Sequence, residues 1–350
     1  MRNTCLFGAM LMALCACGGA PNGAGTHVLA RVHFNTNVSD FERSRAFYRQ
    51  LGFETISGFP DANTLAMAEA IGVSTPTEYD GTQGGEAGGY LLHGELIGLG
   101  FTGGLIDLIE FTIPRNDAPP YRKLNRIGMT HAEMLTTDID ADYLYMTGLG
   151  VEFLSEPVAA ADGSRFAMFK DIDGVFYKLR ETSGEIGETE TTHIERLGAV
   201  TINVTDYDTS KAWYALLGFE QVSELVSSDS AQMAYALGFD KPVKFIGGRF
   251  RHVADGSEIE LIQWLEPFDP TRPYPVPINH IGIHRMAFST SDIESDVALL
   301  QSQGVEMISP ITPCCSGEDS WGGIVAFYDP DGVIMELVEQ PMMTLMSWFN

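Results

Sequence analysis

Two stretches of the sequence share one frame but differ at the side chain best suited to chemistry. NRIGMTHAEMLTTDID begins at Asn125 and NHIGIHRMAFSTSDIE begins at Asn279, 154 residues later; the first has His131 where the second has Arg285. A neutral imidazole can bind a metal ion or transfer a proton near neutral pH, whereas a guanidinium pairs with carboxylates and other anions. The sequence therefore predicts two related sites with different chemistry.

The side chains around each histidine follow from strand geometry, because successive side chains of a strand point to opposite faces. His33, Asn35 and Asn37 alternate with apolar residues in VHFNTNVSD, so they share one polar face. Glu133 shares a face with His131 in the same way. We expect these polar faces to line a site and the apolar faces to pack against helices.

The elements that position these residues recur four times along the chain. A short alternating strand ends in Asp (VHFNTNVSD, THAEMLTTD, AVTINVTD, RMAFSTSD), and both histidines lie seven residues before that Asp. An amphipathic helix follows, then a Gly that ends it, then further strands. The predicted helices are 41–51, 139–148, 208–217 and 293–303, and the predicted β-α-β-β-β units are 27–114, 124–181, 195–267 and 278–340.

The four units group into two similar halves. FERSRAFYRQLGF at 41–53 matches YDTSKAWYALLGF at 207–219, and FKDIDGVFYKLRE at 169–181 matches FYDPDGVIMELVE at 327–339. We therefore expect a first domain at 27–181, a polar acidic linker at 182–194, a second domain at 195–340 and a short tail at 341–350.

This order of motifs resembles the vicinal oxygen chelate superfamily, which includes glyoxalase I, extradiol dioxygenases and bleomycin resistance proteins. The motifs that carry the resemblance are FYRQLGF and WYALLGF after the first helix of each half, and DPDG followed by Glu at its end. The resemblance implies an α+β fold in which βαβββ units form two cupped, barrel-like sheets with helices outside, one cup per half. It leaves the pairing of the units open, because exchanged units also occur in the superfamily.

The resemblance also implies a metal site in the first cup. His33 and His131 stand at the place of the first-strand His ligand, and Asp107 stands at the place of a closing-strand carboxylate. Two imidazoles and a carboxylate suit Fe(II), Mn, Zn or Ni. Lys178 stands where many members have Glu, so a cup without any metal is the alternative.

Further roles follow from the same placement. Glu133 is a candidate general base, and Lys178 a candidate catalytic partner or the ammonium that neutralises Asp107 or Glu133. Asn35, Asn37 and Arg285 are candidate substrate-binding residues. The matching places of the second half hold Ala199, Glu260, Arg285 and Glu336, which indicate a charge-paired cluster with Arg between two carboxylates.

Two kinds of function fit this pattern. The first is a divalent-metal-dependent lyase, isomerase or dioxygenase acting on a small oxygen-chelating substrate in the N-terminal cup. The alternative is a protein that sequesters a small molecule without a metal. The formal net charge of −26 argues against nucleic acid as a partner, and a homodimer is compatible with the resemblance.

The N-terminal segment predicts a cell-envelope location. Residues 1–16 have a short apolar core, and LCAC before a Gly-rich stretch resembles a bacterial lipobox. We expect lipidation of Cys17, a flexible tether at 17–26 and anchoring to the outer membrane or the periplasmic face. An ordinary signal peptide, cleaved nearby, would give a secreted protein instead. Cys314 and Cys315 are expected to be free thiols, because adjacent cysteines bridge only with strain.

Overall fold

A computed structural model describes residues 25–58, 60–73, 76–100, 103–160, 162–184, 191–314 and 322–339. The expected signal segment, Cys17, most of the tether, Cys315 and the tail at 341–350 lie outside the described residues. Within these ranges no helix has the length and the apolar character needed to span a bilayer.

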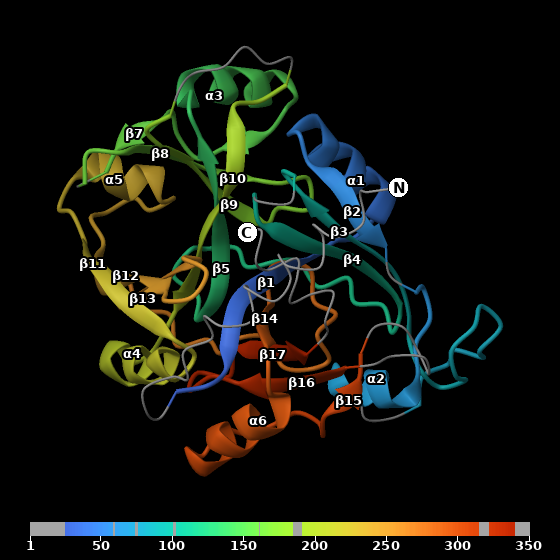
Figure 1. The fold of residues 1–350 in the computed structure, drawn as a ribbon. Helices are drawn as coiled ribbons and strands as arrows, with labels where there is room; N and C mark the ends of the chain where they lie inside the picture. The colour runs from blue at the N-terminus through green and yellow to red at the C-terminus, as the bar shows by residue number, and fades with distance from the viewer. Residues whose placement is uncertain are drawn as a thin grey trace, which may run out of the picture.

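Sheet A has eight strands, which come from the first and the last unit of the sequence. The blue strand β1 and the red strands β16 and β17 belong to this sheet (Figure 1). Across the sheet the order is β15 (Thr312–Pro313), β16 (Gly323–Tyr328), β17 (Ile334–Glu339), β14 (Arg285–Thr290), β1 (Val28–Asn37), β4 (Leu105–Ile113), β3 (Leu91–Gly98) and β2 (Glu54–Gly58).

Sheet B has nine strands, which come from the second and the third unit. The two-residue strand β7 (Val158–Ala159) pairs with β8 beside the main path. Across the sheet the order is β11 (Phe219–Val226), β12 (Lys244–His252), β13 (Glu258–Glu266), β10 (Ile194–Asn203), β5 (Gly128–Thr136), β9 (Phe176–Glu181), β8 (Arg165–Lys170) and β6 (Glu152–Phe153).

Each sheet therefore contains one unit from each half, which corrects the expectation of one cup per half. β1 runs antiparallel to β14, with His33 opposite Ala287, and β10 runs antiparallel to β5, with Thr201 opposite His131. The sequence left this pairing open because the first strand of every unit offers a similar edge to a partner strand. The mixed α+β class is as expected, and the units keep the expected β-α-β-β-β order except for one additional short helix in the first and in the third unit and the additional strand β7 in the second.

Four helices of ten residues begin within one residue of the predicted positions. α1 (Phe41–Gln50), α3 (Ile139–Gly148), α4 (Tyr207–Leu216) and α6 (Ile293–Ser302) each follow an Asp whose carboxylate accepts a hydrogen bond from a backbone N–H of the first turn. These N-cap residues are the strand-ending Asp residues of the repeats. Two shorter helices, α2 (Leu65–Ala70) and α5 (Ala231–Ala236), were not predicted.

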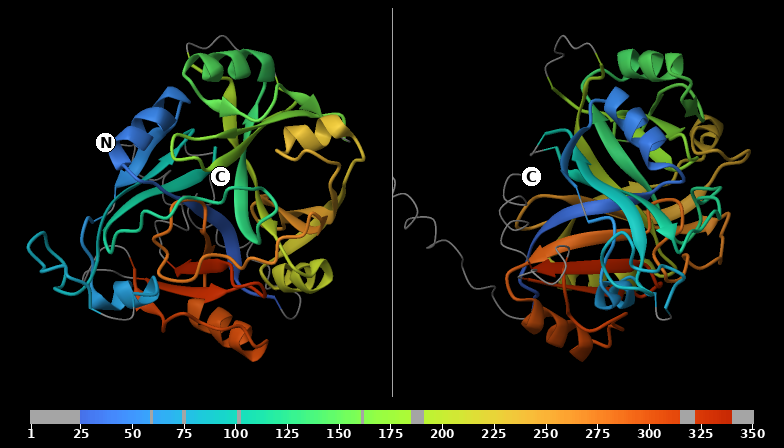
Figure 2. Two further views of the ribbon diagram at one scale, coloured as in Figure 1. Left: turned by 180° about the vertical axis from the view of Figure 1, so that it is seen from behind. Right: turned by 90° about the vertical axis from the view of Figure 1, so that its right-hand side faces the viewer.

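One large core lies between the two sheets. Apolar side chains from β1, β4, β14 and β17 of sheet A and from β5, β9, β10 and β13 of sheet B meet there with the four longer helices. Figure 2 shows these helices around the strands from two further sides. Within a half, Tyr48 of α1 packs edge-on against Tyr177 of β9, and Trp213 of α4 packs against Phe327 of β16. The two units of each half therefore contact each other in this core, whereas their strands pair with strands of the other half.

The opposite faces of the sheets each carry a smaller apolar cluster. On sheet A, Met67 and Ile71 beside α2 pack with Ile109 and Phe111 of β4. Cys314 is buried in this cluster and is disulfide-bonded, which corrects the expectation of a free thiol at that position. On sheet B, residues beside α5 pack with β8 and β13. Charged side chains share these two faces with the apolar clusters.

Candidate functional site

The three expected metal ligands do not form one site. His33 on β1 and Asp107 on β4 lie in sheet A, where Nδ1 of His33 is 3.9 Å from Oδ2 of Asp107. His131 on β5 lies in sheet B. Its Nδ1 is 3.1 Å from the hydroxyl of Thr130, and its Nε2 is 3.1 Å from the hydroxyl of Thr201. The exchanged pairing of the units places the two histidines in different sheets, so His33, Asp107 and His131 do not surround one metal ion as expected.

Arg285 takes the central place on sheet A instead. Its guanidinium donates to Oδ2 of Asp107 from one side and lies 3.2 Å from Oε1 of Glu336 on the other. We call His33, Asp107, Arg285 and Glu336 the Arg285 cluster; all four are buried. The expected arrangement of an arginine between two carboxylates is present, but one carboxylate is Asp107 of the first half rather than Glu260.

Three polar atoms of the Arg285 cluster have no hydrogen-bond partner among the described residues. They are Nδ1 of His33, Oδ1 of Asp107 and Nε of Arg285. Buried polar atoms in folded proteins are nearly all hydrogen-bonded, and an unpaired one costs about 1–3 kcal/mol. Their concentration on three neighbouring side chains makes the Arg285 cluster a candidate site.

Asn35 and Asn37, expected to bind substrate, have their amide groups occupied by the chain. Oδ1 of Asn35 accepts from the backbone N–H of Arg285 at 2.8 Å, and its Nδ2 donates to Oδ1 of Asn37 at 2.8 Å. Nδ2 of Asn37 donates to the backbone oxygens of Ile278 and His280. The two amides therefore fix the segment that leads into β14 and so place Arg285.

Burial sets the protonation states in the Arg285 cluster. It lowers the pKa of His33 well below the ordinary value, and nearby Arg285 adds to this effect, so the imidazole is neutral. Burial raises the pKa of Asp107 although Arg285 opposes it. Burial also raises the pKa of Glu336 to about 7, again against the pull of Arg285. Glu336 can therefore gain or lose a proton near neutral pH.

These residues do not fit a divalent metal ion. The guanidinium of Arg285 is permanently charged and already lies between the two carboxylates that would bind the ion. In the part of the chain that the structure describes, no three or more His, Cys, Asp or Glu side chains are grouped as a metal ion requires. The cluster is thus built around a cation that belongs to the chain.

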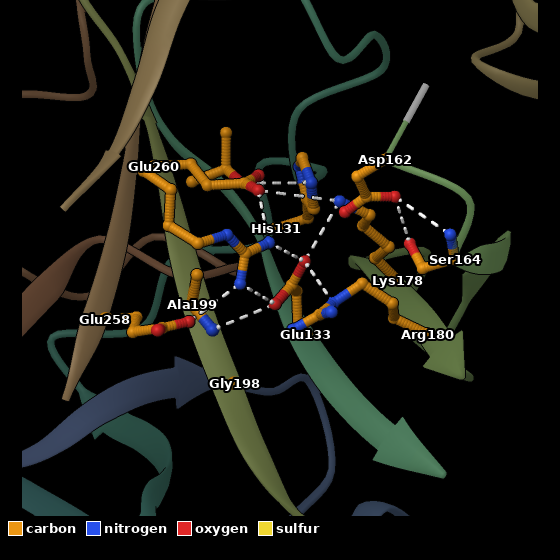
Figure 3. Close-up of polar contacts among 12 residues, drawn as sticks. His131, Glu133, Asp162, Ser164, Lys178, Arg180, Gly198, Ala199, Glu258 and Glu260 are labelled. Carbon is orange, nitrogen blue, oxygen red and sulfur yellow. Dashed lines mark hydrogen bonds and ion pairs between the residues drawn. The ribbon is translucent and has the colours of Figure 1, made fainter. Parts of the chain in front are cut away.

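Sheet B carries a second charged network, centred on Glu133 (Figure 3). The carboxylate of Glu133 accepts hydrogen bonds from both terminal nitrogens of Arg249, at 2.7 and 3.1 Å. It also lies 2.9 Å from Nζ of Lys178 and 3.1 Å from Nε of Arg180. We call these four residues, with Glu260, the Glu133 cluster; Glu260 lies 2.6 Å from Arg249 and 3.7 Å from Lys178.

The carboxylate of Glu133 is neutralised from within its cluster, where Nε of Arg180 is the one buried atom of a described residue that lacks a hydrogen-bond partner. Burial by itself would raise the pKa of Glu133, but Lys178, Arg249 and Arg180 hold it well below the ordinary value. The side chain of Glu133 is 0% exposed, whereas those of Lys178, Arg249 and Arg180 are 13–17% exposed, so the cations cover it. This arrangement favours a structural role for Glu133 and Lys178, the expected base and its partner.

The backbone beside Glu133 is shaped for this contact. The backbone N–H of Ala199 donates to Oε2 of Glu133 at 3.2 Å. A Cβ at Gly198 would come within 2.7 Å of the same oxygen, so only glycine allows the close approach. Nearby, burial lowers the pKa of His131 to about 4, and Lys178 adds to the effect.

Sequence reasoning missed Arg249 and Arg180, which complete the Glu133 cluster. A signal was available for Arg249: the run GGRFRH alternates Arg with Phe250, as a strand does when one face is charged and the other is buried. This signal did not identify Glu133 as the partner of Arg249, because the two residues lie 116 positions apart and belong to different halves.

Comparisons with known proteins agree with this architecture. The family model described as Glyoxalase/Bleomycin resistance protein/Dioxygenase superfamily matches residues 30–179 and again residues 196–337. The uncharacterized protein YaeR of Escherichia coli strain K12 is 31% identical over 154 residues, which cover 42% of this chain and 98% of YaeR.

Two solved structures resemble nearly the whole chain in fold. A mutant of glyoxalase I from Zea mays has a TM-score of 0.59 at 15% identity, covering 92% of this chain and 95% of the other. A putative dioxygenase from Bacillus subtilis has a TM-score of 0.54 at 14% identity, covering 91% of this chain and 87% of the other. At such identities the likeness concerns the fold.

Proposed function

Because the chain belongs to the glyoxalase/bleomycin resistance protein/dioxygenase superfamily, we propose that it binds a small oxygen-rich molecule at the Arg285 cluster, without a divalent metal ion. The observation that carries this proposal is the group of three buried, unpaired polar atoms on His33, Asp107 and Arg285. A ligand that accepts from Nε of Arg285, donates to Oδ1 of Asp107 and shares a hydrogen bond with Nδ1 of His33 would satisfy all three.

The charge of the Arg285 cluster favours a neutral ligand. The positive charge of Arg285 is balanced by Asp107 and, above pH 7, exceeded once Glu336 ionises. An added anion would meet a buried site with no positive charge to spare, at a desolvation cost of several kcal/mol. We therefore propose hydroxyl and carbonyl groups, rather than carboxylate or phosphate, as the ligand's polar atoms.

The surroundings supply an apolar wall for the rest of such a ligand. Tyr90, Ile109 and Phe111 belong to the buried apolar cluster on the same face of sheet A. Tyr90 lies near enough to the charges of Arg285, Glu336 and Asp107 for all three to influence its pKa, which burial raises above the ordinary value. Ligand sites combine such apolar walls with a few well-placed polar groups.

Metal analysis and binding measurements test the proposal together. Purified protein is analysed for bound metals, and its melting temperature is followed while hydroxy-ketones and vicinal diols are added, each beside its carboxylate analogue. We expect the neutral compounds to raise the melting temperature, with EDTA having no effect. Asp107→Asn should abolish the shift, and Lys178→Met on sheet B should preserve it.

The sequence first led us to expect a metal-dependent lyase, isomerase or dioxygenase. For such an enzyme the opposite results are expected. The purified protein would then retain a divalent metal, and EDTA would remove the effect of the ligand. Either result would reject the metal-free site. Equal shifts in the wild type and in Asp107→Asn would reject the Arg285 cluster as the place of binding.

A second candidate function is proton transfer within the bound molecule, which the pKa of Glu336 supports. At about 7, this carboxylate can take a proton from a carbon beside a carbonyl group. Arg285 would stabilise the enolate oxygen that forms. The proton of the substrate hydroxyl would pass to that oxygen, and the proton held by Glu336 would return to the neighbouring carbon. Isomerisation of a hydroxy-ketone should then depend on a group of pKa near 7, and Glu336→Gln should abolish turnover but retain binding.

We also propose that a lipid at Cys17, outside the described residues, anchors the protein to the cell envelope. The lipobox-like LCAC of the sequence supports this location. The wild type should be recovered with the membrane fraction, and Cys17→Ser should release it. Recovery of both forms in the soluble fraction would favour secretion.

A further inference from the structure

We infer that Arg285 is a built-in substitute for a divalent cation, so that exchanging this one side chain for histidine creates a metal site from His33, Asp107 and Glu336. This inference goes beyond the proposed function, because it concerns the cation of the cluster rather than the ligand. It rests on how three ligand-type side chains surround a single guanidinium.

The geometry already brings two carboxylates to one buried cation. Asp107 accepts a hydrogen bond from Nη2 of Arg285, and Oε1 of Glu336 is 3.2 Å from Nη1. The carboxylates come from β4 and β17, on opposite sides of the β1–β14 pair, so only a charge between them can satisfy both. A guanidinium and a divalent ion can both take such a place between two carboxylates.

The atoms that would bind a metal are free to do so. Nδ1 of His33 and Oδ1 of Asp107 have no partner in the described part of the chain. Burial keeps His33 neutral, which is the form that ligates metals. With histidine at 285, the set becomes two imidazoles and two carboxylates, which suits Zn(II), Mn(II) or Fe(II).

Electrostatics explains why the wild type would take no metal there and why the variant would. An ion entering beside Arg285 would meet a permanent positive charge at contact distance. Loss of that charge leaves Asp107 and Glu336 uncompensated in a buried place, which is strongly unfavourable. A divalent ion restores the balance, so binding of the ion is coupled to stability of the fold.

Sheet B offers a control in which another cation lies beside two carboxylates. Lys178 lies 2.9 Å from Glu133 and 3.7 Å from Glu260, and Lys178→His would put a second imidazole near these carboxylates and His131. Both carboxylates nevertheless keep Arg249, which lies 2.7 Å from Glu133 and 2.6 Å from Glu260. Histidine and carboxylates alone therefore do not predict metal binding; removal of the central cation does.

The experiment measures metal retained by the full-length protein. Wild type, Arg285→His, Arg285→Lys and Lys178→His are incubated with Zn(II), passed through a desalting column and analysed for zinc per chain. We expect about one equivalent in Arg285→His and a background level in the other three, with a zinc-dependent rise in melting temperature in Arg285→His alone. The double variant Arg285→His/His33→Ala should return to background.

Two results would overturn the inference. One is a folded Arg285→His protein, judged by circular dichroism, that retains no more zinc than the wild type. The other is stoichiometric zinc in the wild type that His33→Ala removes. If Arg285→His unfolds without metal, refolding with and without Zn(II) gives the same decision, because rescue by zinc supports the site and failure of rescue rejects it. Neither result depends on the organic ligand.

Discussion

Arg285 donates a hydrogen bond to Asp107 across the seam of sheet A, although 178 residues separate them in the sequence. Asp107 belongs to the first unit and Arg285 to the last, and the antiparallel pair β1–β14 brings their strands together. The cluster that carries the proposed function therefore exists only when both halves of the chain are folded against each other.

Because each sheet contains strands of both halves, we expect the two halves to remain associated after the linker between them is cut. A protease site introduced within residues 185–190 should allow complete cleavage, yet the fragments should elute together at the volume of the intact protein. The reason is that both sheets and the shared core cross between the halves. Separation of the fragments at micromolar concentration in native buffer would contradict this arrangement.

Glu336→Gln should change how stability depends on pH. The pKa of Glu336 is about 7 in the folded protein against 4.5 ordinarily, so the folded state binds the proton more tightly. Its contribution to stability is full below pH 4.5 and is lost as pH rises through 7. Glutamine resembles the protonated form at every pH.

The measurement is denaturant unfolding of both proteins at pH 5 and pH 8.5. Relative to the wild type, Glu336→Gln should gain as much as about 3 kcal/mol of unfolding free energy at the higher pH. Asp171 and Asp329 also have pKa values of about 7, but they are present in both proteins and cancel in the difference. An unchanged difference between the two pH values would show that Glu336 is ionised throughout.

Glu133→Ala should strongly lower the free energy of unfolding. Replacing Arg249 in the same protein should lower it by less than the two single losses together. Glu133→Ala leaves Lys178, Arg180 and Arg249 short of a buried counter-charge, at a cost of about 3 kcal/mol or more in unfolding free energy. In the double variant Glu133→Ala/Arg249→Met the loss should be clearly smaller than the sum of the single losses. Additive losses would mean that the two residues do not interact.

The two tyrosines that bond to the Asp of the DxDG turns should differ in importance. Tyr48 donates to Asp171 at 3.0 Å and lies 2.9 Å from the hydroxyl of Tyr177, while Tyr214 donates to Asp329 at 3.0 Å. Each replacement by phenylalanine leaves a buried carboxylate oxygen unpaired, at a cost of about 1–3 kcal/mol. Thermal unfolding should show the larger loss for Tyr48→Phe, because the Tyr177 hydroxyl then loses one of its two side-chain partners and keeps only Thr36.

The sequence by itself determined the elements and their local geometry. Four repeated strands end in Asp residues that cap the helices which follow, and four glycines after those helices have the positive φ angles that this position requires. The polar faces of β1 and β5 and the likeness to the glyoxalase superfamily also followed from alternation and motif order. These features depend on residues that are near neighbours in the chain.

The tertiary structure decided which polar faces meet. His33 and His131 occupy the same place in successive repeats, yet one lies beside Arg285 in sheet A and the other beside Thr201 in sheet B. Repeats of one pattern present nearly identical strand edges, so their local sequence cannot specify which edges pair. That choice depends on the fit of the whole core. It replaces the single metal site expected from the sequence with two separate charged clusters, each of which contains cations of the chain itself.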